Sequence, residues 1–338
     1  MRFFTILNTL VAVSLLSAPV LGATKETIIA RGWLSCGINQ GLPGFSSPDA
    51  KGRWSGFDVD FCRAVAAAVL RDPAKVRFRT LSAKERFTAL QSGEIDLLSR
   101  NTTWTQTRDT ALGLNFAGII YYDGQSFMVR RSIGVKSARE LSGAAVCVNA
   151  GTTTELNLAD YFRTRKMRYT PVVFEKSDEV LAAYVAGRCD VYSTDQSGLY
   201  AQRLKLRDPA AHVILPDIIS KEPLGPVVRQ GDDGWFNIVR WTLFALIGAE
   251  ELGVTSGNVG RLAVSATDPE IRRLLGTEGK VGANLGLDPK WAQRIIAAVG
   301  NYGELFERHL GESSRLKIKR GLNRLWNKGG LQYAPPIR

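Results

Sequence analysis

An arginine and an aspartate stand among polar residues in two distant parts of this chain. Arg108 closes the segment RNTTWTQTR, and Asp195 directly follows the run DVYST. A guanidinium binds a carboxylate through paired, charge-assisted hydrogen bonds, and a carboxylate accepts hydrogen bonds from an ammonium. If the fold brings them together, the two side chains could bind a molecule with both charges, such as a free α-amino acid.

Polar residues follow four predicted strands, in segments 39–45, 100–108, 151–155 and 194–196. Open α/β sheets place their ligand crevices at the carboxyl ends of strands, so these segments should converge. Threonine, asparagine and aspartate in front of a helix are commonly caps, and that interpretation stays open for each cluster. The charge pattern favours binding, because one cluster offers a guanidinium and another offers a carboxylate.

The same clusters offer little for catalysis. Glu155 is the one candidate acid or base near the predicted cleft, and its place in the first turn of a helix suits dipole stabilisation. No Gly-x-Ser-x-Gly, His-Glu-x-x-His or phosphate-loop motif occurs. His212 and His309 lie far from every cysteine, whereas a metal site needs closer ligand spacing. We therefore expect no enzymatic activity, no cofactor and no metal ion.

Alternating strands and helices must position these residues. The predicted strands are 27–38, 76–80, 95–99, 144–148, 171–174 and 190–194, and the predicted helices are 61–70, 83–92, 177–186 and one that ends at 161. Such alternation indicates an α/β sheet with helices on its faces. A helix–Gly–x–x–Asp–strand pattern occurs twice, at Gly93/Asp96 and Gly187/Asp190, which indicates two lobes of the same kind.

The chain is expected to cross between the lobes twice, at 121–130 and 218–229. Residues 24–122 plus 229–338 would form the first lobe, and 123–228 the second. The residues after the second crossing read as a helical extension that packs on the first lobe. It includes an amphipathic helix at 235–249 and a basic terminal helix at 315–328.

The first 23 residues have the form of a secretory signal peptide. A positive start precedes an apolar run and a small-residue exit, with cleavage expected after Ala23. Polar residues interrupt the run, so it falls short of the roughly 20 apolar residues of a membrane span, although an uncleaved anchor is the open alternative. No cysteine follows that could carry a lipid. We expect a soluble protein of the periplasm.

Export makes the four cysteines candidates for disulfide bonds. Three pairings are possible, and buried free thiols are the alternative. We favour Cys36–Cys62 and Cys147–Cys189, because each pair then lies within one lobe. The net charge of +12 would otherwise invite a nucleic-acid partner, but export argues against one.

Five segments resemble bacterial solute-binding proteins of family 3, which bind polar amino acids. WSGFDVDFCRAVA at 54–66 is similar to the family signature, and segments 39–45, 81–93, 99–108 and 148–158 are similar to the general L-amino-acid-binding branch. The resemblance covers residues 28–228 and extends to the long C-terminal extension. It implies the two-lobed periplasmic-binding-protein fold of type II.

The resemblance also implies roles for individual residues. Arg108 matches the residue that binds the ligand α-carboxylate, Thr103 and Asn101 match assisting neighbours, and Thr153 matches a second-lobe threonine that closes on the carboxylate. Asp195 matches the acceptor of the α-ammonium. Asp58 and Asp60 belong to the signature, and we expect both to be helix caps.

Three positions depart from the relatives that bind basic amino acids. Asn39 replaces an aspartate, Leu42 replaces an aromatic residue that stacks on the ligand, and Ala83 replaces a larger residue. We therefore expect a permissive pocket for polar, acidic and neutral L-amino acids. The ligand would be delivered by hinge closure to the permease and ATPase of an ABC importer, with the binding protein a monomer. An amino-acid-sensing receptor domain, and a dehydratase on the same fold, are the alternatives.

Overall fold

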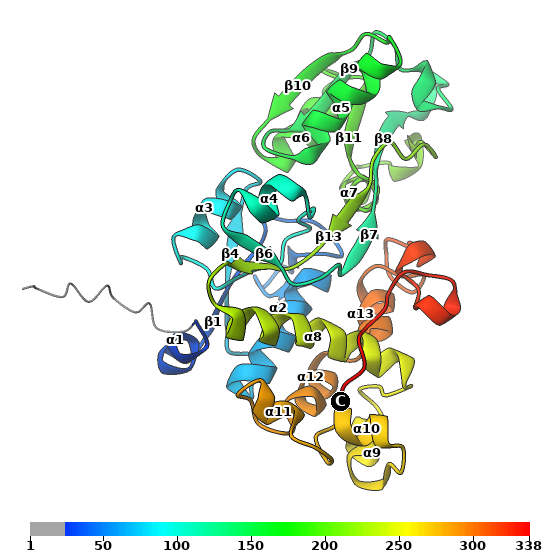
Figure 1. The fold of residues 1–338 in the computed structure, drawn as a ribbon. Coiled ribbons are helices and arrows are strands. Elements are labelled where there is room, and N and C mark those ends of the chain that lie inside the picture. The colour runs from blue at the N-terminus through cyan, green and yellow to red at the C-terminus, as the bar shows by residue number, and fades with distance from the viewer. Residues whose placement is uncertain (1–23) are drawn as a thin grey trace, which may run out of the picture.

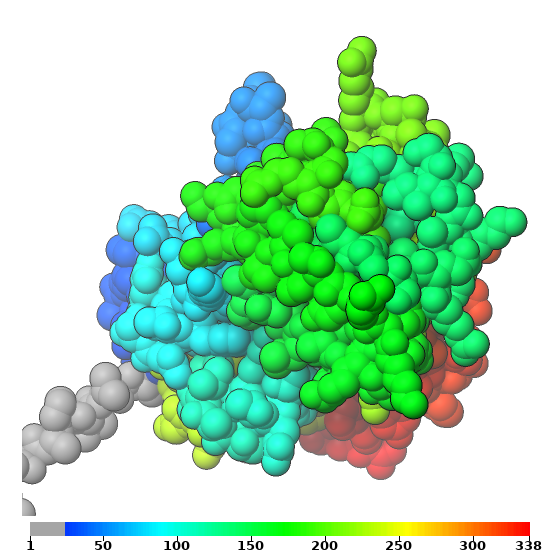
Figure 2. Space-filling view, turned by 90° about the horizontal axis from the view of Figure 1, so that it is seen from above, coloured from blue at the N-terminus to red at the C-terminus, as the bar shows by residue number. Residues whose placement is uncertain are grey.

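The computed structural model describes residues 24–338, so the predicted signal peptide lies outside the described residues. Two lobes, each built on a five-stranded sheet, are joined by a two-stranded sheet (Figure 1). Helices of the C-terminal part lie beneath the first lobe in this view, and the second lobe stands above it. Seen from above, the second lobe covers the centre of the molecule (Figure 2).

The first sheet has the strand order β4-β1-β5-β14-β6. Its strands are β1 (Leu34–Asn39), β4 (Val76–Leu81), β5 (Leu97–Leu98), β6 (Leu114–Phe116) and β14 (Val227–Arg229). β1 runs parallel to β4 and β5, whereas β14 is antiparallel to β5 and β6. The associated helices are α2 (Phe57–Leu70), α3 (Glu85–Gln91) and α4 (Gln106–Thr110), and β2 (Ser47–Pro48) pairs with β3 (Trp54–Ser55).

The second sheet repeats this plan with the order β10-β9-β11-β8-β12. Its strands are β8 (Gln125–Arg130), β9 (Ala145–Asn149), β10 (Thr170–Phe174), β11 (Val191–Asp195) and β12 (His212–Ile214). Its helices are α5 (Thr153–Thr164), α6 (Ser177–Val185) and α7 (Gln196–Arg203). β9 is parallel to β10 and β11, and β8 is antiparallel to β11 and β12. The predicted mixed sheet flanked by helices is confirmed in both halves.

Two antiparallel strands connect the lobes. β7 (Tyr121–Asp123) leads into the second lobe, and β13 (Glu222–Leu224) leads back to the first. Both strands fall within the predicted crossing segments. The polar loop after β5 lies against β13, because Trp104 N donates to Pro223 O at 2.8 Å and Gly225 N donates to Thr102 O at 2.9 Å.

The C-terminal helices pack on the first lobe, as predicted. They are α8 (Asp233–Glu251), α9 (Val259–Ser265), α10 (Pro269–Leu274), α11 (Val281–Asn284), α12 (Trp291–Val299) and α13 (Tyr302–His309). One continuous apolar core joins them to α2, and its largest buried side chains include Trp235, Trp291 and Phe306. Because burying an aromatic side chain contributes roughly 2–3 kcal/mol, the extension and the first lobe form one folding unit.

The predicted strand at 27–38 is wrong in its first half. Residues Thr24–Arg31 form helix α1, which buries Ile28 against the core and leaves Ile29 half exposed. Gly32, at φ 83°, ends the helix before β1 begins at Leu34. The apolar pair Ile28-Ile29 fits either structure, so the pattern alone could not separate a helix from a strand.

The predicted terminal helix at 315–328 is also wrong. This segment contains only two short 3₁₀ turns, at Gly321–Asn323 and Trp326–Lys328. Lys317 and Gly321 have positive φ values of 53° and 49°, which a right-handed helix excludes. The red C-terminal segment of Figure 1 instead runs beside β7. Contacts with the hinge therefore replace helical hydrogen bonds here.

Both favoured disulfide bonds are confirmed. Cys36 in β1 pairs with Cys62 in α2, and Cys147 in β9 pairs with Cys189 just before β11. Each bond joins elements within one lobe, so neither restricts movement of one lobe against the other. Across residues 24–338, no helix is long and apolar enough to cross a membrane.

Candidate ligand-binding site

A polar pocket lies between the lobes, where the carboxyl ends of β1, β5, β9 and β11 meet. Its walls come from both lobes: Asn39, Leu42, Ala83, Arg86, Arg100, Asn101 and Thr103 from the first, and Asn149, Thr152, Thr153, Thr154, Ser177, Tyr192, Thr194, Asp195, Gly198 and Gln202 from the second. The four predicted clusters therefore converge. Every predicted ligand-binding residue except Arg108 lines this pocket.

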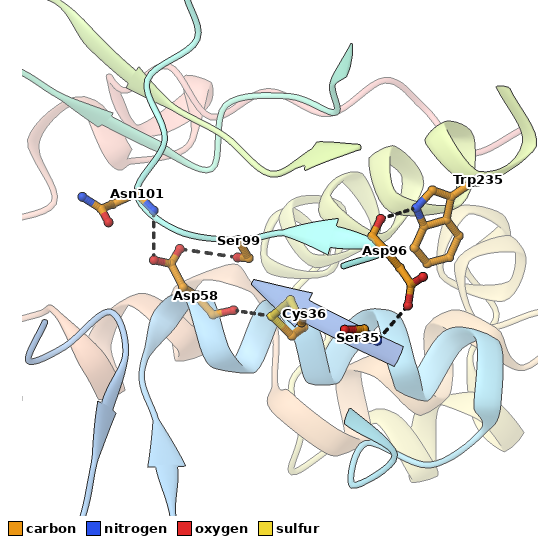
Figure 3. The surroundings of a disulfide bond; sticks show 8 residues. Ser35, Cys36, Asp58, Asp96, Ser99, Asn101 and Trp235 are labelled. Carbon is orange, nitrogen blue, oxygen red and sulfur yellow. Dashed lines mark hydrogen bonds between the residues drawn. A yellow bond between two sulfur atoms is a disulfide. The ribbon is translucent and has the colours of Figure 1, made fainter. Parts of the chain in front are cut away.

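The loop after β5 is held in place by Asp58 of α2. Its carboxylate accepts from Asn101 N at 3.1 Å and from Ser99 Oγ at 3.5 Å (Figure 3). Asn101 has a positive φ of 33°, so this contact holds a bend that the backbone rarely adopts. Burial raises the pKa of Asp58 to about 7. The expected cap role is wrong, because Gly56 is the N-cap of α2 and Asp58 lies within its first turn. Asp58 positions the pocket loop instead.

Asp60 is likewise no cap. Its carboxylate accepts from Arg63 at 2.8 Å and Arg308 at 2.9 Å, and lies 2.7 Å from His309 Nε2. Burial would raise its pKa, but the hydrogen bond and charge of His309 and the two arginines lower it to about 2. Asp60 therefore connects the family signature to the C-terminal extension.

The first-lobe wall combines one amide pair with two small apolar contacts. Asn39 Nδ2 donates to Asn101 Oδ1 at 3.1 Å, and Leu42 and Ala83 are 5% exposed. No aromatic ring or carboxylate stands at Asn39, Leu42 or Ala83, so these positions offer neither a charged nor a stacking partner for a positively charged side chain.

Arg108 lies directly behind this wall. Its Nη1 donates to Thr103 O at 2.8 Å, and its guanidinium stacks 5.1 Å from the ring centre of Phe87. Burial lowers the pKa of Arg108, while the charges of Glu222 and Asp195 partly offset that effect. The structure thus places its charge next to Thr103 but not among the atoms that line the pocket.

Two further arginines, Arg86 and Arg100, line the pocket and were missed by the sequence reasoning. Arg100 Nε donates to Leu81 O at 2.9 Å, and Arg86 Nη1 approaches Thr102 Oγ1 at 3.4 Å. Among the described residues, Arg86 Nε finds no hydrogen-bond partner. Both arginines lie within segments that resemble the family, 81–93 and 99–108, and this position in the sequence could have identified them.

Burial and mutual repulsion act on both of these arginines. Burial, followed by the charges of Arg108 and Arg100, lowers the pKa of Arg86, and burial lowers the pKa of Arg100 to about 10. A guanidinium nevertheless stays protonated at neutral pH. The first lobe therefore presents concentrated positive charge to the pocket.

The second lobe presents the opposite charge. Asp195 ends β11, is 6% exposed, and has a raised pKa because of burial and the neighbouring charges of Asp123 and Glu222. Burial also raises the pKa of Asp123 to about 6. Thr153, the first residue of α5, stands at a helix N-terminus, where backbone N–H groups attract anions.

The two lobes touch across the pocket, so the structure is a closed form. Thr103 Oγ1 lies 3.4 Å from Thr153 Oγ1. Lys205 Nζ donates to Gly41 O at 2.6 Å, and Lys84 Nζ lies 3.9 Å from Glu175. In the part of the chain that the structure describes, His, Cys, Asp and Glu form no group of three or more that could hold a metal ion.

Two α/β lobes, two crossing strands and a closed polar pocket between them define the class of two-lobed solute-binding proteins. The family model of bacterial extracellular solute-binding proteins, family 3, matches residues 34–255. The chain belongs to this family. Its type II fold is thereby established.

Curated relatives match along nearly the whole chain. The general L-amino acid-binding periplasmic protein AapJ of Rhizobium johnstonii is 64% identical over 317 residues, which are 93% of each chain. The glutamate/glutamine/aspartate/asparagine-binding protein BztA of Rhodobacter capsulatus is 55% identical over 327 residues, 96% of this chain and 97% of the relative. Both relatives are named as binding proteins rather than enzymes.

Solved structures agree with this family. A periplasmic binding protein of an ABC transporter from Brucella ovis, with glutathione bound, is 62% identical, with a TM-score of 0.92 over 94% of this chain and 99% of that one. An ancestral amino acid-binding protein, described as a precursor of cyclohexadienyl dehydratase, is 28% identical with a TM-score of 0.58 over 69% of this chain.

Proposed function

We propose that this protein binds free L-amino acids between its lobes and delivers them to an ABC importer. The observation that carries the proposal is the division of charge around one pocket: buried arginines on the first lobe face a buried carboxylate on the second. A zwitterion satisfies both sides at once, and closure removes water from the charges. A molecule that lacks either charge leaves a buried group unpaired and binds more weakly.

Within this proposal, Asp195 accepts hydrogen bonds from the ligand ammonium. Arg108, which lies behind Thr103, turns its guanidinium toward the α-carboxylate. The N-terminus of α5, beginning at Thr153, completes the carboxylate site with backbone N–H groups. Asn101 and Asn39 bind remaining polar atoms of the ligand.

Arg86 and Arg100 define which ligand side chains are favoured. A buried guanidinium with an unpaired N–H group gains a strong hydrogen bond from a carboxylate or an amide oxygen. We therefore propose acidic and amide side chains as the preferred ligands, with small neutral ones tolerated beside Leu42 and Ala83. This preference is supported by BztA, a glutamate/glutamine/aspartate/asparagine-binding protein, and by the Brucella ovis protein, which has glutathione bound.

The cellular setting follows from the family and the predicted signal peptide. We propose a periplasmic monomer, with lobes at 24–122 plus 229–338 and at 123–228, that docks on the permease of an importer driven by an ATPase. A sensory domain would transmit closure to another protein rather than release its ligand to a permease. A dehydratase would need an acid or base at the ligand, and the raised pKa of Asp195 is the feature that would serve such a reaction.

Thermal denaturation with each of the twenty L-amino acids tests the proposed function. A ligand at about 100 times its Kd should stabilise the native state by about 2.7 kcal/mol. Melting temperatures should rise most with glutamate, glutamine, aspartate and asparagine, and less with lysine and arginine. An Arg108→Ala variant should lose most of each shift. No shift with any amino acid would exclude the proposal, and turnover of a bound ligand would favour an enzyme.

A further inference from the structure

Four hydrogen-bond donors converge on the carboxylate of Glu222, a 1% exposed residue of hinge strand β13. Thr103 Oγ1 and Thr153 Oγ1 lie 2.6 and 2.8 Å from Oε2. Asn157 Nδ2 and Ser220 Oγ each lie 2.6 Å from Oε1. Glu222 itself does not line the pocket, yet both threonines do. One hinge side chain thus connects the first lobe, the second lobe and the wall of the ligand site.

A threonine hydroxyl has one hydrogen and two lone pairs. Thr103 and Thr153 both give that hydrogen to the same oxygen of Glu222. The two threonine oxygens lie 3.4 Å apart, and neither has a hydrogen left for the other or for a ligand. Toward the pocket, both hydroxyls can only accept.

The surroundings hold Glu222 in this role. Ser220 Oγ accepts from Gln125 N at 3.3 Å, so its own hydrogen is free for Glu222. The amide of Asn157 can only donate through its nitrogen, which fixes Oε1 as an acceptor. An ionised carboxylate satisfies all four donors without a conflict.

We infer that Glu222 is a positioning residue that turns the hydroxyls of Thr103 and Thr153 into acceptors for the ligand ammonium. This inference rests on the proposed function and extends it. The two hydroxyls join Asp195 as a ring of acceptors, while the α-carboxylate is left to Arg108 and to backbone N–H groups. This assignment departs from the carboxylate role that the family resemblance implies for Thr153, because its hydroxyl gives its hydrogen to Glu222. Closure and recognition of the ammonium are thereby coupled through a residue of the hinge, since the ring forms only when Thr153 approaches Thr103.

A variant that removes the Glu222 carboxylate tests the inference. A glutamine could still accept from both threonines through its amide oxygen, so the substitution used is Glu222→Leu: leucine offers no acceptor, and the hydroxyl hydrogens of Thr103 and Thr153 are then free to turn toward the pocket. The probes are the twenty L-amino acids and, for the tightest of them, the carboxylic acid that lacks only the α-ammonium. We expect amino acids to bind about tenfold to a hundredfold more weakly, and the deaminated acid to lose less affinity or gain some. Glu312→Leu, the same change at an exposed residue that does not line the pocket, should alter affinity by less than about twofold.

Thr153 variants provide a second measurement that leaves the hinge intact. Thr153→Ser keeps the hydroxyl and should retain amino-acid affinity, whereas Thr153→Val should weaken it as Glu222→Leu does. Affinity for amino acids that is unchanged in Glu222→Leu, or that falls equally for the deaminated acid, would overturn the inference. If the unaltered protein binds none of the amino acids, the proposed function itself fails, and this result is distinguishable from the others.

Discussion

At the scale of single residues, the site contains several buried charged side chains, which lower the stability of the fold. Arg86, Arg100 and Arg108 lie within the first-lobe side of the cleft, and Asp123, Asp195 and Glu222 lie on the other side and at the hinge. Burying unpaired charge opposes folding. Binding explains the arrangement, because a zwitterion between the closed lobes pairs with the arginines on one side and with Asp195 on the other.

For Asp58, the free-energy cost of burying an ionisable group can be measured. Its pKa rises from 3.8 to about 7 on folding because the carboxyl is fully buried. A group whose pKa is raised by folding holds its proton more tightly in the native state. The free energy of unfolding therefore falls as pH rises from about 4 to about 7, and is constant with respect to this group above that range.

An Asp58→Asn variant should remove this dependence. We expect its free energy of unfolding, relative to the unaltered protein, to increase by about 4 kcal/mol between pH 4 and pH 7, which follows from a pKa difference of about three units. Urea denaturation at several pH values measures the difference directly. A gap between the two proteins that stays constant with pH would contradict the burial argument for Asp58.

At the scale of elements, the sequence predicts most of what local pattern controls. Alternating β-branched and apolar residues located β4, β9 and β11, and glycine stops located the ends of α3 and α6. The same reasoning brought the polar ends of these strands to one pocket. It wrongly assigned a strand to residues 27–31 and a helix to residues 315–328, where the pattern fits more than one local structure.

The hinge contacts could not be predicted because no local pattern encodes them. Glu222 bonds to Thr103 across 119 residues, and Asn323 bonds to Tyr122 across 201 residues. Asn323 Oδ1 accepts from Tyr122 N at 2.7 Å, and its Nδ2 donates to Tyr122 O at 3.1 Å. Gln332 supports the same crossing through Ile120 O at 3.3 Å. The side chain of Asn323 therefore pairs with the backbone of β7, as a third strand would.

An Asn323→Ala variant should weaken this crossing. It removes the partners of the part-buried N–H and C=O of Tyr122, which costs about 1–3 kcal/mol. Chemical denaturation should show this loss, and hydrogen exchange at residues 120–123 should accelerate. Asn284→Ala, an exposed position at the end of α11, is the matched control and should change stability by less than about 0.5 kcal/mol. Equal stability of the two variants would mean that the segment does not support the hinge.

At the scale of the whole molecule, function requires two arrangements of the same lobes. Each disulfide bond lies within one lobe, so neither opposes opening. The lobes are held together by polar contacts around the pocket and by α7, whose Ala201 packs into the first-lobe core with Tyr200 and Leu204 beside it. A ligand that adds its own contacts to both lobes shifts the balance toward the closed state.

Lys205 provides the clearest of these closing contacts. It follows α7 in the second lobe, and its ammonium donates to Gly41 O of the first lobe at 2.6 Å and to Asp178 at 2.9 Å. Its side chain is 25% exposed, so water only partly screens the contact. A Lys205→Met variant keeps the apolar stem and removes the charge. We expect the ligand-free protein to open further and ligands to bind roughly threefold to tenfold more weakly, because each ligand must now supply more of the closing free energy.

Small-angle scattering and calorimetry together test this expectation. The radius of gyration of the ligand-free Lys205→Met protein should increase, while saturating ligand restores the compact value, and the dissociation rate should account for the lost affinity. Lys136→Met, an exposed lysine of the second lobe, removes the same charge away from the cleft and should leave both quantities unchanged. If Lys205→Met binds as tightly as the unaltered protein and scatters identically, closure depends instead on the hinge contacts of Glu222, and the two variants then separate the rim of the cleft from its hinge.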